Sequence, residues 1–329
     1  MTYTTLGWLM DSQDLQARIQ HPWMGLRRPE QQQVFQLRTR LLQLFREYFT
    51  QHGYTELVSP KVVAAGLENN IDAFELDFFG QPALLSKGPQ VYKTMLLAAG
   101  YHRVFEIGPV FRREKTFTPG HVAEFTAIDA DFDMVSSVDD VMDEFERMFM
   151  YVFKEVYETC GGSLQLQKPL GIPRISIRDA YKLLRKQGRT ISDGDGLTIE
   201  DEALLGAWAA QQGSDFVIVR DYPWSDRFFY YMRDEQDPVY SQSFDVLFRG
   251  REVATCARKE HRKEAILEQA SIKGVDPASI DWYLKLFDDG MPPYGGGGIG
   301  VDRLLQQLVG AKDIREVIMF PRDPNILKP

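Results

Sequence analysis

The chain alternates between short apolar stretches of strand-like composition and longer stretches with a helical repeat. Residues 104–111 are apolar and rich in strand-forming side chains, and residues 124–132 alternate apolar and acidic positions. Both patterns predict strands. The polar loop between them contains Pro119-Gly120, a pair that favours a turn. We therefore predict an antiparallel hairpin from these two strands.

Two long segments carry apolar side chains at helical spacing. Residues 31–52 and residues 138–160 each present an apolar stripe with a polar face opposite. Such a stripe usually packs into a protein core. Gly161-Gly162 is expected to end the second helix. A further short helix is predicted around residues 11–20.

The second half of the chain predicts more strands and one small helical region. Residues 216–219 are an apolar run typical of a buried strand, and residues 244–248 and 252–255 predict a hairpin that turns at Arg249-Gly250. Residues 295–298 are four consecutive glycines, which suggest that a ligand approaches the backbone closely. Residues 175–212 predict a small helical insertion.

The composition describes an acidic chain that is large enough for a substantial core. It has 329 residues, of which 44% are hydrophobic, and a formal net charge of −9. This charge argues against a generally basic surface that coats nucleic acid, but it allows a local basic patch for an RNA end. Cys160 and Cys256 are the two cysteines, so we expect neither a disulfide framework nor a paired-cysteine metal site. The chain shows no signal-peptide pattern and no apolar run of roughly 20 residues, so we expect a cytoplasmic protein without a membrane span.

The predicted hairpin carries side chains suited to a nucleotide beside an amino acid. Arg112 and Glu114 lie on its first strand, and Phe125 and Asp129 lie on its second. An arginine can grip a phosphate with two hydrogen bonds, and a carboxylate can hold an ammonium group. Charged residues on a hairpin are more often a solvated surface. The distant glycine run, followed by Arg303 at the start of an amphipathic helix, favours the functional interpretation.

These stretches resemble the motifs of class II aminoacyl-tRNA synthetases. Residues 111–114 with the loop that follows resemble motif 2, residues 295–303 resemble motif 3, and residues 34–60 resemble motif 1. The subgroup looks like the aspartyl and asparaginyl enzymes, closest to the archaeal-type aspartyl form. The resemblance covers residues 26–329. It implies an α+β fold with a mostly antiparallel sheet flanked by helices, in a homodimer joined through the motif 1 region.

The resemblance implies ATP as a cofactor and assigns roles around it. Arg112 would bridge the substrate carboxylate and the α-phosphate. Arg303 would hold the phosphate tail and lie against the adenine. Phe125 would stack under the adenine, Glu114 would hydrogen-bond its amino group, and His121 would reach the terminal phosphate.

The resemblance also implies Mg²⁺ and an amino-acid site. Asp245 and Glu252 would carry Mg²⁺ as hard oxygen ligands, and Glu252 would also contact ATP. The substrate ammonium would meet carboxylates and an amide. The residues assigned to the amino acid are Glu68, Gln90, Lys93, Asp129 and Lys259.

The side-chain end of the predicted pocket departs from the family pattern. Lys259 stands where the family has an arginine that binds the substrate side chain, and a lysine cannot reproduce a bidentate grip. Arg258 lies one residue earlier, so on a regular strand it faces the other way. Cys256 replaces a family glycine, and we expect it to add bulk to the pocket. A lysine still favours a carboxylate, so aspartate is the first substrate to test.

Residues 1–25 form a predicted N-terminal extension that is too short for the family's anticodon-binding barrel. We therefore expect an aminoacyl-adenylate to be passed to a non-standard acceptor rather than to bulk tRNA. Ammonia, as in the archaeal asparagine synthetase related to aspartyl-tRNA synthetase, a small molecule or a protein are candidate acceptors. One alternative is a genuine aspartate or asparagine tRNA ligase. Another is a non-catalytic paralog that senses an amino acid or binds a partner.

Overall fold

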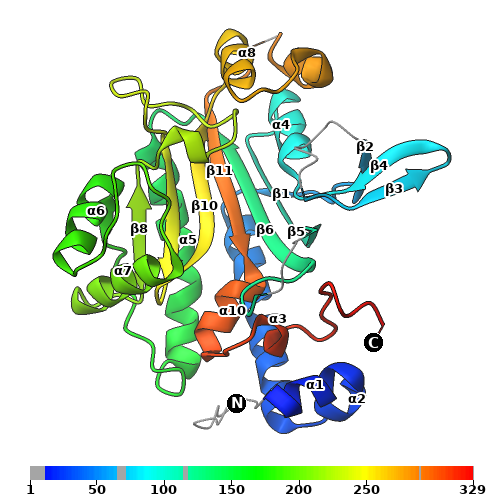
Figure 1. Ribbon diagram of the computed structural model, residues 1–329, viewed down its shortest axis with the longest axis vertical. Coiled ribbons are helices and arrows are strands. Elements are labelled where there is room, and N and C mark those ends of the chain that lie inside the picture. The colour runs from blue at the N-terminus through cyan, green and yellow to red at the C-terminus, as the bar shows by residue number, and fades with distance from the viewer. Residues whose placement is uncertain (1–11, 65–71, 114–117, 289, 329) are drawn as a thin grey trace.

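The computed structural model describes residues 12–64, 72–113, 118–288 and 290–328, which form an α+β fold around one large sheet. Eight strands lie in the order β1-β5-β6-β11-β10-β9-β8-β7 (Figure 1). Neighbouring strands are antiparallel except at the two edges, where β1 pairs in parallel with β5 and β7 with β8. The predicted mostly antiparallel sheet flanked by helices is confirmed.

The α-helices and strands have the following bounds. The helices are α1 Ser12–Gln20, α2 Pro22–Gly25, α3 Pro29–Gln51, α4 Gln90–Ala98, α5 Val138–Cys160, α6 Ile177–Lys186, α7 Ile199–Gln211, α8 Lys263–Ile272, α9 Asp281–Leu284 and α10 Val301–Val309. The strands of the large sheet are β1 Thr55–Glu56, β5 Arg103–Phe111, β6 Glu124–Asp133, β7 Arg174–Ser176, β8 Phe216–Arg220, β9 Ser243–Phe248, β10 Arg251–Lys259 and β11 Tyr294–Gly300. A separate three-stranded sheet contains β2 Val62–Ala64, β3 Glu75–Phe78 and β4 Gln81–Leu85.

Both hairpins predicted from the sequence are present. Strands β5 and β6 pair along the whole of β5, and β9 and β10 are joined by a tight turn. Arg249 and Gly250 form that turn with φ of +50° and +74°. Two successive residues with positive φ suit a tight hairpin, because this backbone twist matches the twist of the flanking strands.

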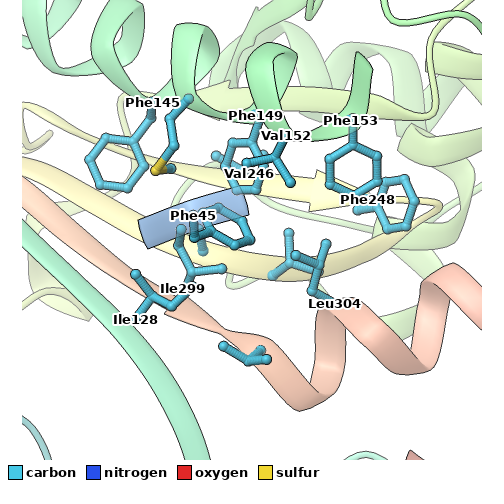
Figure 2. Close-up of a cluster of buried hydrophobic side chains, with 14 of the residues drawn as sticks. Phe45, Ile128, Phe145, Phe149, Val152, Phe153, Val246, Phe248, Ile299 and Leu304 are labelled. Atoms are coloured by element: carbon cyan, nitrogen blue, oxygen red, sulfur yellow. The ribbon is translucent and has the colours of Figure 1, made fainter. Parts of the chain in front are cut away.

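The main core lies between the sheet and the helices α3 and α5. Alternate residues of the strands point toward these helices, among them Ile128 of β6, Val246 of β9 and Ile299 of β11 (Figure 2). They meet Phe45 of α3 and Phe149 of α5, whose ring centroids are 6.3 Å apart in an edge-to-face arrangement. The two helical stripes predicted from the sequence therefore form one shared core.

The opposite face of the sheet is covered by two separate groups of helices. Helices α6 and α7 pack on β8 and β9 at one side of the sheet, and α4, α8 and α9 pack at the other (Figure 1). The first cluster includes Tyr181, Leu184, Leu205, Val219 and Leu247, and the second includes Leu97, Val104, Ile266, Tyr283 and Tyr294. Between them lie β6, β11 and β10, which carry the polar residues predicted to form the site.

Helix α1 docks on the C-terminal segment of the chain. The guanidinium group of Arg18 donates to the carbonyl oxygen of Ile318 at 3.2 Å and also to that of Arg315.

The predicted boundary after residue 25, between an extension and the catalytic domain, stays a prediction. Within the ranges that the structure describes, no helix is both long enough and apolar enough to span a membrane.

Candidate active site

Strand β6 carries a residue predicted to bind the nucleotide and a residue predicted to bind the amino acid. Side chains two apart on a strand share a face, so Phe125, Asp129 and Asp131 lie on the side opposite the buried Ile128. At roughly 3.3 Å per residue, the four-residue spacing separates Phe125 from Asp129 by about 13 Å. Strand β6 is hydrogen-bonded on both sides, to β5 and to β11, so this spacing is held by the sheet.

Arg112 follows β5 directly and lies beside the Phe125 ring. Its backbone N–H donates to the carbonyl oxygen of Ala123 at 2.9 Å, which keeps the hairpin paired past the end of the strand. The Arg112 guanidinium carbon lies 5.5 Å from the centroid of the Phe125 ring, within reach of a cation–π contact. The structure thus brings together the predicted phosphate-binding arginine and the predicted adenine-stacking ring. Glu114 and Glu68 lie outside the described residues.

His121 belongs to a turn that docks against α10. Its Nδ1 lies 2.5 Å from the hydroxyl oxygen of Thr118. Between these residues, the carbonyl oxygen of Pro119 accepts hydrogen bonds from the backbone N–H of Ile314 at 2.8 Å and from the side-chain amide of Gln306 at 3.2 Å. The motif 2 loop and the motif 3 helix are therefore in direct contact.

Arg303 lies in the first turn of α10, immediately after the glycine strand β11. Its Nη1 donates to the carbonyl oxygen of Glu252 at 3.1 Å and lies 3.5 Å from Glu252 Oε1. The hydroxyl group of Thr255 donates to the same carboxylate oxygen at 3.3 Å. The predicted phosphate-binding arginine therefore lies beside a predicted Mg²⁺ ligand.

A β-bulge in β10 sets the direction of the Glu252 side chain. The pairing of β10 with β9 shifts by one residue between Glu252 and Ala254. Val253 and Ala254 are both buried in the main core as a result. Glu252 and Lys259 are seven residues apart, an odd spacing that would put them on opposite faces of a regular strand. The extra residue instead brings both onto the face that also carries Thr255.

Asp245 of β9 lies on the same face and forms an ion pair with Arg227. Arg227 Nη2 is 2.9 Å from Asp245 Oδ2, and its guanidinium carbon is 4.1 Å from the centroid of the Tyr222 ring. The other carboxylate oxygen, Asp245 Oδ1, is buried and has no hydrogen-bond partner in the described part of the chain. Burial, followed by the charge of Asp245, raises the pKa of the Glu252 carboxyl.

These two carboxylates fit the predicted Mg²⁺. Among the described residues, no group of three or more acidic, histidine or cysteine side chains is arranged to hold a metal ion. Mg²⁺ in nucleotide sites is usually held by only one or two carboxylates, with waters and substrate phosphates as the other ligands. The unpartnered oxygen of Asp245 and the mutual repulsion of Asp245 and Glu252 suit such an ion.

Four of the residues predicted to bind the amino acid, all within the described part of the chain, converge in a buried polar cluster: Gln90, Lys93, Asp129 and Lys259. Lys93 Nζ lies 2.8 Å from Asp131 Oδ1 and 3.2 Å from Asp129 Oδ1. Lys259 Nζ lies 2.7 and 2.8 Å from the two oxygens of Asp131 and 2.5 Å from Gln90 Oε1. Burial opposes ionisation of Asp131, but the charges of Lys259 and Lys93 outweigh it and lower its pKa. Burial lowers the pKa of Lys259 to about 8.

Lys259, not Arg258, enters this cluster. Arg258 points away and donates to the side-chain oxygen of Gln242 at 3.2 Å. The expectation that Cys256 adds bulk to the pocket is wrong. Cys256 is three residues before Lys259, so its side chain lies on the other face and packs in the main core.

The glycines of β11 leave room for the acidic side chains of β6. Gly298 pairs with Asp129, and Gly296 pairs with Asp131. Gly296 has φ of +154°, and a Cβ there would lie 2.4 Å from Asp131 Oδ1 and 2.0 Å from the carbonyl oxygen of Ala130. A larger residue would therefore displace the carboxylate that both lysines contact.

Comparison with known proteins places this arrangement in a family. The family model of tRNA synthetases class II (D, K and N) matches residues 14–324 of the chain. The chain belongs to this family. It is therefore a ligase of the class II synthetase type.

The relatives of this class II synthetase include archaeal ligases. It is 38% identical over 324 residues to the aspartate–tRNA(Asp/Asn) ligase of Aeropyrum pernix, and the match covers 96% of this chain and 73% of the relative. It is 35% identical over 325 residues to the aspartate–tRNA(Asp) ligase of Pyrococcus abyssi, covering 96% of this chain and 74% of that protein.

Solved structures agree with this assignment. The aspartyl-tRNA synthetase of Entamoeba histolytica superposes with a TM-score of 0.85 at 32% identity, covering 97% of this chain and 64% of that chain. The asparaginyl-tRNA synthetase of Pyrococcus horikoshii, complexed with asparaginyl-adenylate, gives a TM-score of 0.88 at 26% identity, covering 95% of this chain and 74% of that chain.

Three residues of the candidate site were not predicted from the sequence. Asp131 had a signal, because it is two residues after Asp129 and must share its face. Arg227 comes from an irregular segment that offers no periodic pattern. Glu202 comes from α7, and its Oε2 accepts the backbone N–H of Glu252 at 3.1 Å. Burial raises the pKa of Glu202 to about 7.

Proposed function

We propose that this class II synthetase uses ATP to form an aminoacyl-adenylate from an amino acid of aspartate-like size. In this reaction a carboxylate oxygen of the amino acid attacks the α-phosphorus of ATP. A phosphorus–oxygen bond to that carboxylate forms as the bond to pyrophosphate breaks. Two anions must approach each other, so cations positioned near the developing charge lower the barrier.

The observation that carries the proposal is the alignment of Arg112, Phe125 and Asp129 along one hairpin. Adenine stacked on Phe125 and an ammonium group held at Asp129 would be about 13 Å apart. Arg112 lies opposite Ala123, just beyond Phe125, with its guanidinium group beside the Phe125 ring, so it would contact a phosphate attached to a base stacked there. A base site, a neighbouring cation and an ammonium site on one hairpin suit an aminoacyl-adenylate.

The second cation and the acidic pair would act on the phosphate tail. Arg303 would bind phosphate oxygens from α10, next to Glu252. Asp245 and Glu252 would hold Mg²⁺, which when bound would neutralise phosphate charge. His121, in the turn docked on α10, is the candidate for contact with the terminal phosphate.

The amino-acid end would be bound by the buried polar cluster. Asp129, whose side chain is 18% exposed, is its accessible carboxylate and would accept the substrate ammonium. Gln90, Lys93 and Lys259 would lie at the same end. Glu68 is proposed for the same group from its place in the sequence. The names of the relatives make aspartate and asparagine the first substrates to test.

Amino-acid-dependent exchange of pyrophosphate into ATP tests the proposal directly. The assay would use the twenty standard amino acids and close analogues of aspartate, with and without Mg²⁺. We expect exchange that requires both one small amino acid and Mg²⁺. Absence of exchange with every amino acid, in a folded protein that binds ATP, would favour the non-catalytic sensor instead.

The acceptor of the activated group is a separate prediction. The sequence-based expectation is an acceptor other than bulk tRNA, such as ammonia, a small molecule or a protein. The similarity to aspartate–tRNA ligases favours a tRNA end. Charging of unfractionated tRNA should be measured beside exchange, with the amino acid that gives the fastest exchange. Efficient charging would decide for tRNA, and exchange with no charging would decide for another acceptor.

A further inference from the structure

The ammonium group of Lys259 is fully hydrogen-bonded within the protein. A lysine ammonium has three donors. Its nitrogen lies 2.5 Å from Gln90 Oε1 and 2.7 and 2.8 Å from the two oxygens of Asp131. Lys259 is 1% exposed. No donor of Lys259 is left for the side chain of a substrate.

The Asp131 carboxylate is equally saturated. Besides its two contacts with Lys259, it accepts from Lys93 Nζ at 2.8 Å and from Gln90 Nε2 at 3.1 Å. Gln90 Nε2 also lies 3.2 Å from the hydroxyl oxygen of Thr94. Asp131 and Lys93 are each 0% exposed. These groups form a closed network that needs no further partner.

The charges of the cluster already cancel. Lys93 and Lys259 contribute two positive charges, and Asp129 and Asp131 contribute two negative charges, which gives a formal sum of zero. A substrate ammonium at Asp129 is a favourable addition, because Asp129 is the partly exposed member. A further substrate charge, a side-chain carboxylate, would enter a buried cluster in which, among the described residues, at most one N–H is unused, on Lys93. Burying a charge without a full set of partners is strongly unfavourable.

We propose that Asp131 takes, from the protein's own chain, the place between the two lysines that a substrate side-chain carboxylate would otherwise fill. The site would then accept an amino acid whose side chain is uncharged and no longer than that of asparagine, and it would discriminate against aspartate. This inference rests on the proposed function, because it concerns the amino acid that is activated. Asp131 is accordingly a specificity-determining residue.

The first test compares amino acids in the exchange assay. Wild-type protein should use its best substrate among glycine, alanine, serine and asparagine with a kcat/KM at least tenfold above that for aspartate. Asp131→Ala frees both lysines and should change the ratio of these two kcat/KM values by at least tenfold in favour of aspartate. Asp133→Ala is the matched control, because this acid lies on the same strand and binds His102 instead, at 2.8 Å. It should leave the ratio unchanged.

A second variant guards against failure of Asp131→Ala to fold. Lys259→Arg keeps the charge and provides five donors instead of three, so donors remain after Asp131 and Gln90 are satisfied. It should also raise the relative use of aspartate. A wild type that prefers aspartate over every uncharged amino acid would overturn the inference and leave the proposed function standing.

Binding of stable adenylate analogues gives a readout that does not depend on catalysis. Calorimetry would compare the sulfamoyl analogues of aspartyl-, asparaginyl- and alanyl-adenylate. Tighter binding of an uncharged analogue supports the inference even if exchange is too slow to measure. Tighter binding of the aspartyl analogue overturns it. If no analogue binds and no amino acid supports exchange, the proposed function fails and the inference fails with it.

Discussion

Replacing Arg227 with methionine would leave Asp245 as a buried carboxylate without its cation. The side chains of this ion pair are 11% and 6% exposed, and their nearest atoms are 2.9 Å apart. Removing one partner of a buried pair typically costs about 3–5 kcal/mol, because the remaining charge is uncompensated. At roughly 2 °C per kcal/mol for a large domain, Tm should fall by about 6–10 °C. Methionine retains much of the side-chain volume, so packing on Tyr222 changes little.

Mg²⁺ should restore part of this lost stability. Asp245 and Glu252 already repel each other, and Arg227 is the cation that contacts Asp245 directly. An ion that binds only the folded state stabilises by RT ln(1 + [L]/Kd), or about 2.7 kcal/mol at one hundred times Kd. Thermal unfolding in EDTA and in millimolar Mg²⁺ should therefore show a larger Mg²⁺ shift for Arg227→Met than for wild type.

The double variant Arg227→Met with Asp245→Asn is the control for this prediction. It removes both charges, so it should recover stability relative to Arg227→Met and lose the enhanced response to Mg²⁺. A loss of less than about 1 kcal/mol in the free energy of unfolding of Arg227→Met, or an equal rise in the Tm of wild type and variant with Mg²⁺, would contradict the prediction. Ca²⁺ in place of Mg²⁺ would show whether the response is specific for the smaller ion.

Three further predictions concern catalysis, acid stability and assembly. Arg112→Ala or Arg303→Ala should reduce exchange by the equivalent of ~3–4 kcal/mol while circular dichroism shows an intact fold; near-normal exchange would exclude that arginine from the mechanism. Burial opposes ionisation of Glu144, but the hydrogen bond from Arg147 and nearby charges outweigh it and lower its pKa. Its stabilisation is therefore present above the unfolded pKa and lost as pH falls through the lower folded value. Glu144→Gln should lower the free energy of unfolding by about 1.5–3 kcal/mol at pH 7. Chemical denaturation should show that this difference from wild type disappears below about pH 4. A difference that does not change with pH would contradict this. Sedimentation at micromolar concentration should give twice the 37.8 kDa of the chain, as expected for a homodimer through α3, and a strict monomer would count against it.

Local pattern predicted those parts of the site that lie on one hairpin. The alternation along residues 124–132 put Phe125 and Asp129 on one face because a single strand carries both. The same rule also places Asp131 on this face, and it places the Cys256 side chain on the face away from the pocket.

Other parts of the site had no local signal. Arg227 reaches Asp245 from an irregular segment, and their contact depends on how that segment folds over β9. The bulge at Val253 inserts one residue without a glycine or proline to mark it. Its effect on Glu252 appears only when β10 is paired with β9. Contacts between elements that are distant in sequence depend on tertiary packing, which a residue pattern does not encode locally.

The position of β6 in the middle of the sheet has a consequence for how such a protein can change its substrate. Phe125, proposed for the adenine, and Asp129, proposed for the substrate ammonium, share this one strand with Asp131, and hydrogen bonds hold the strand on both edges. The groups that contact Asp131 come from elsewhere, Gln90 and Lys93 from α4 and Lys259 from β10. Point changes at Asp131, on α4 or on β10 could therefore exchange one amino acid for another while Phe125 and Asp129 keep their spacing. Such a division would let a duplicated gene acquire a new metabolic role through a few substitutions.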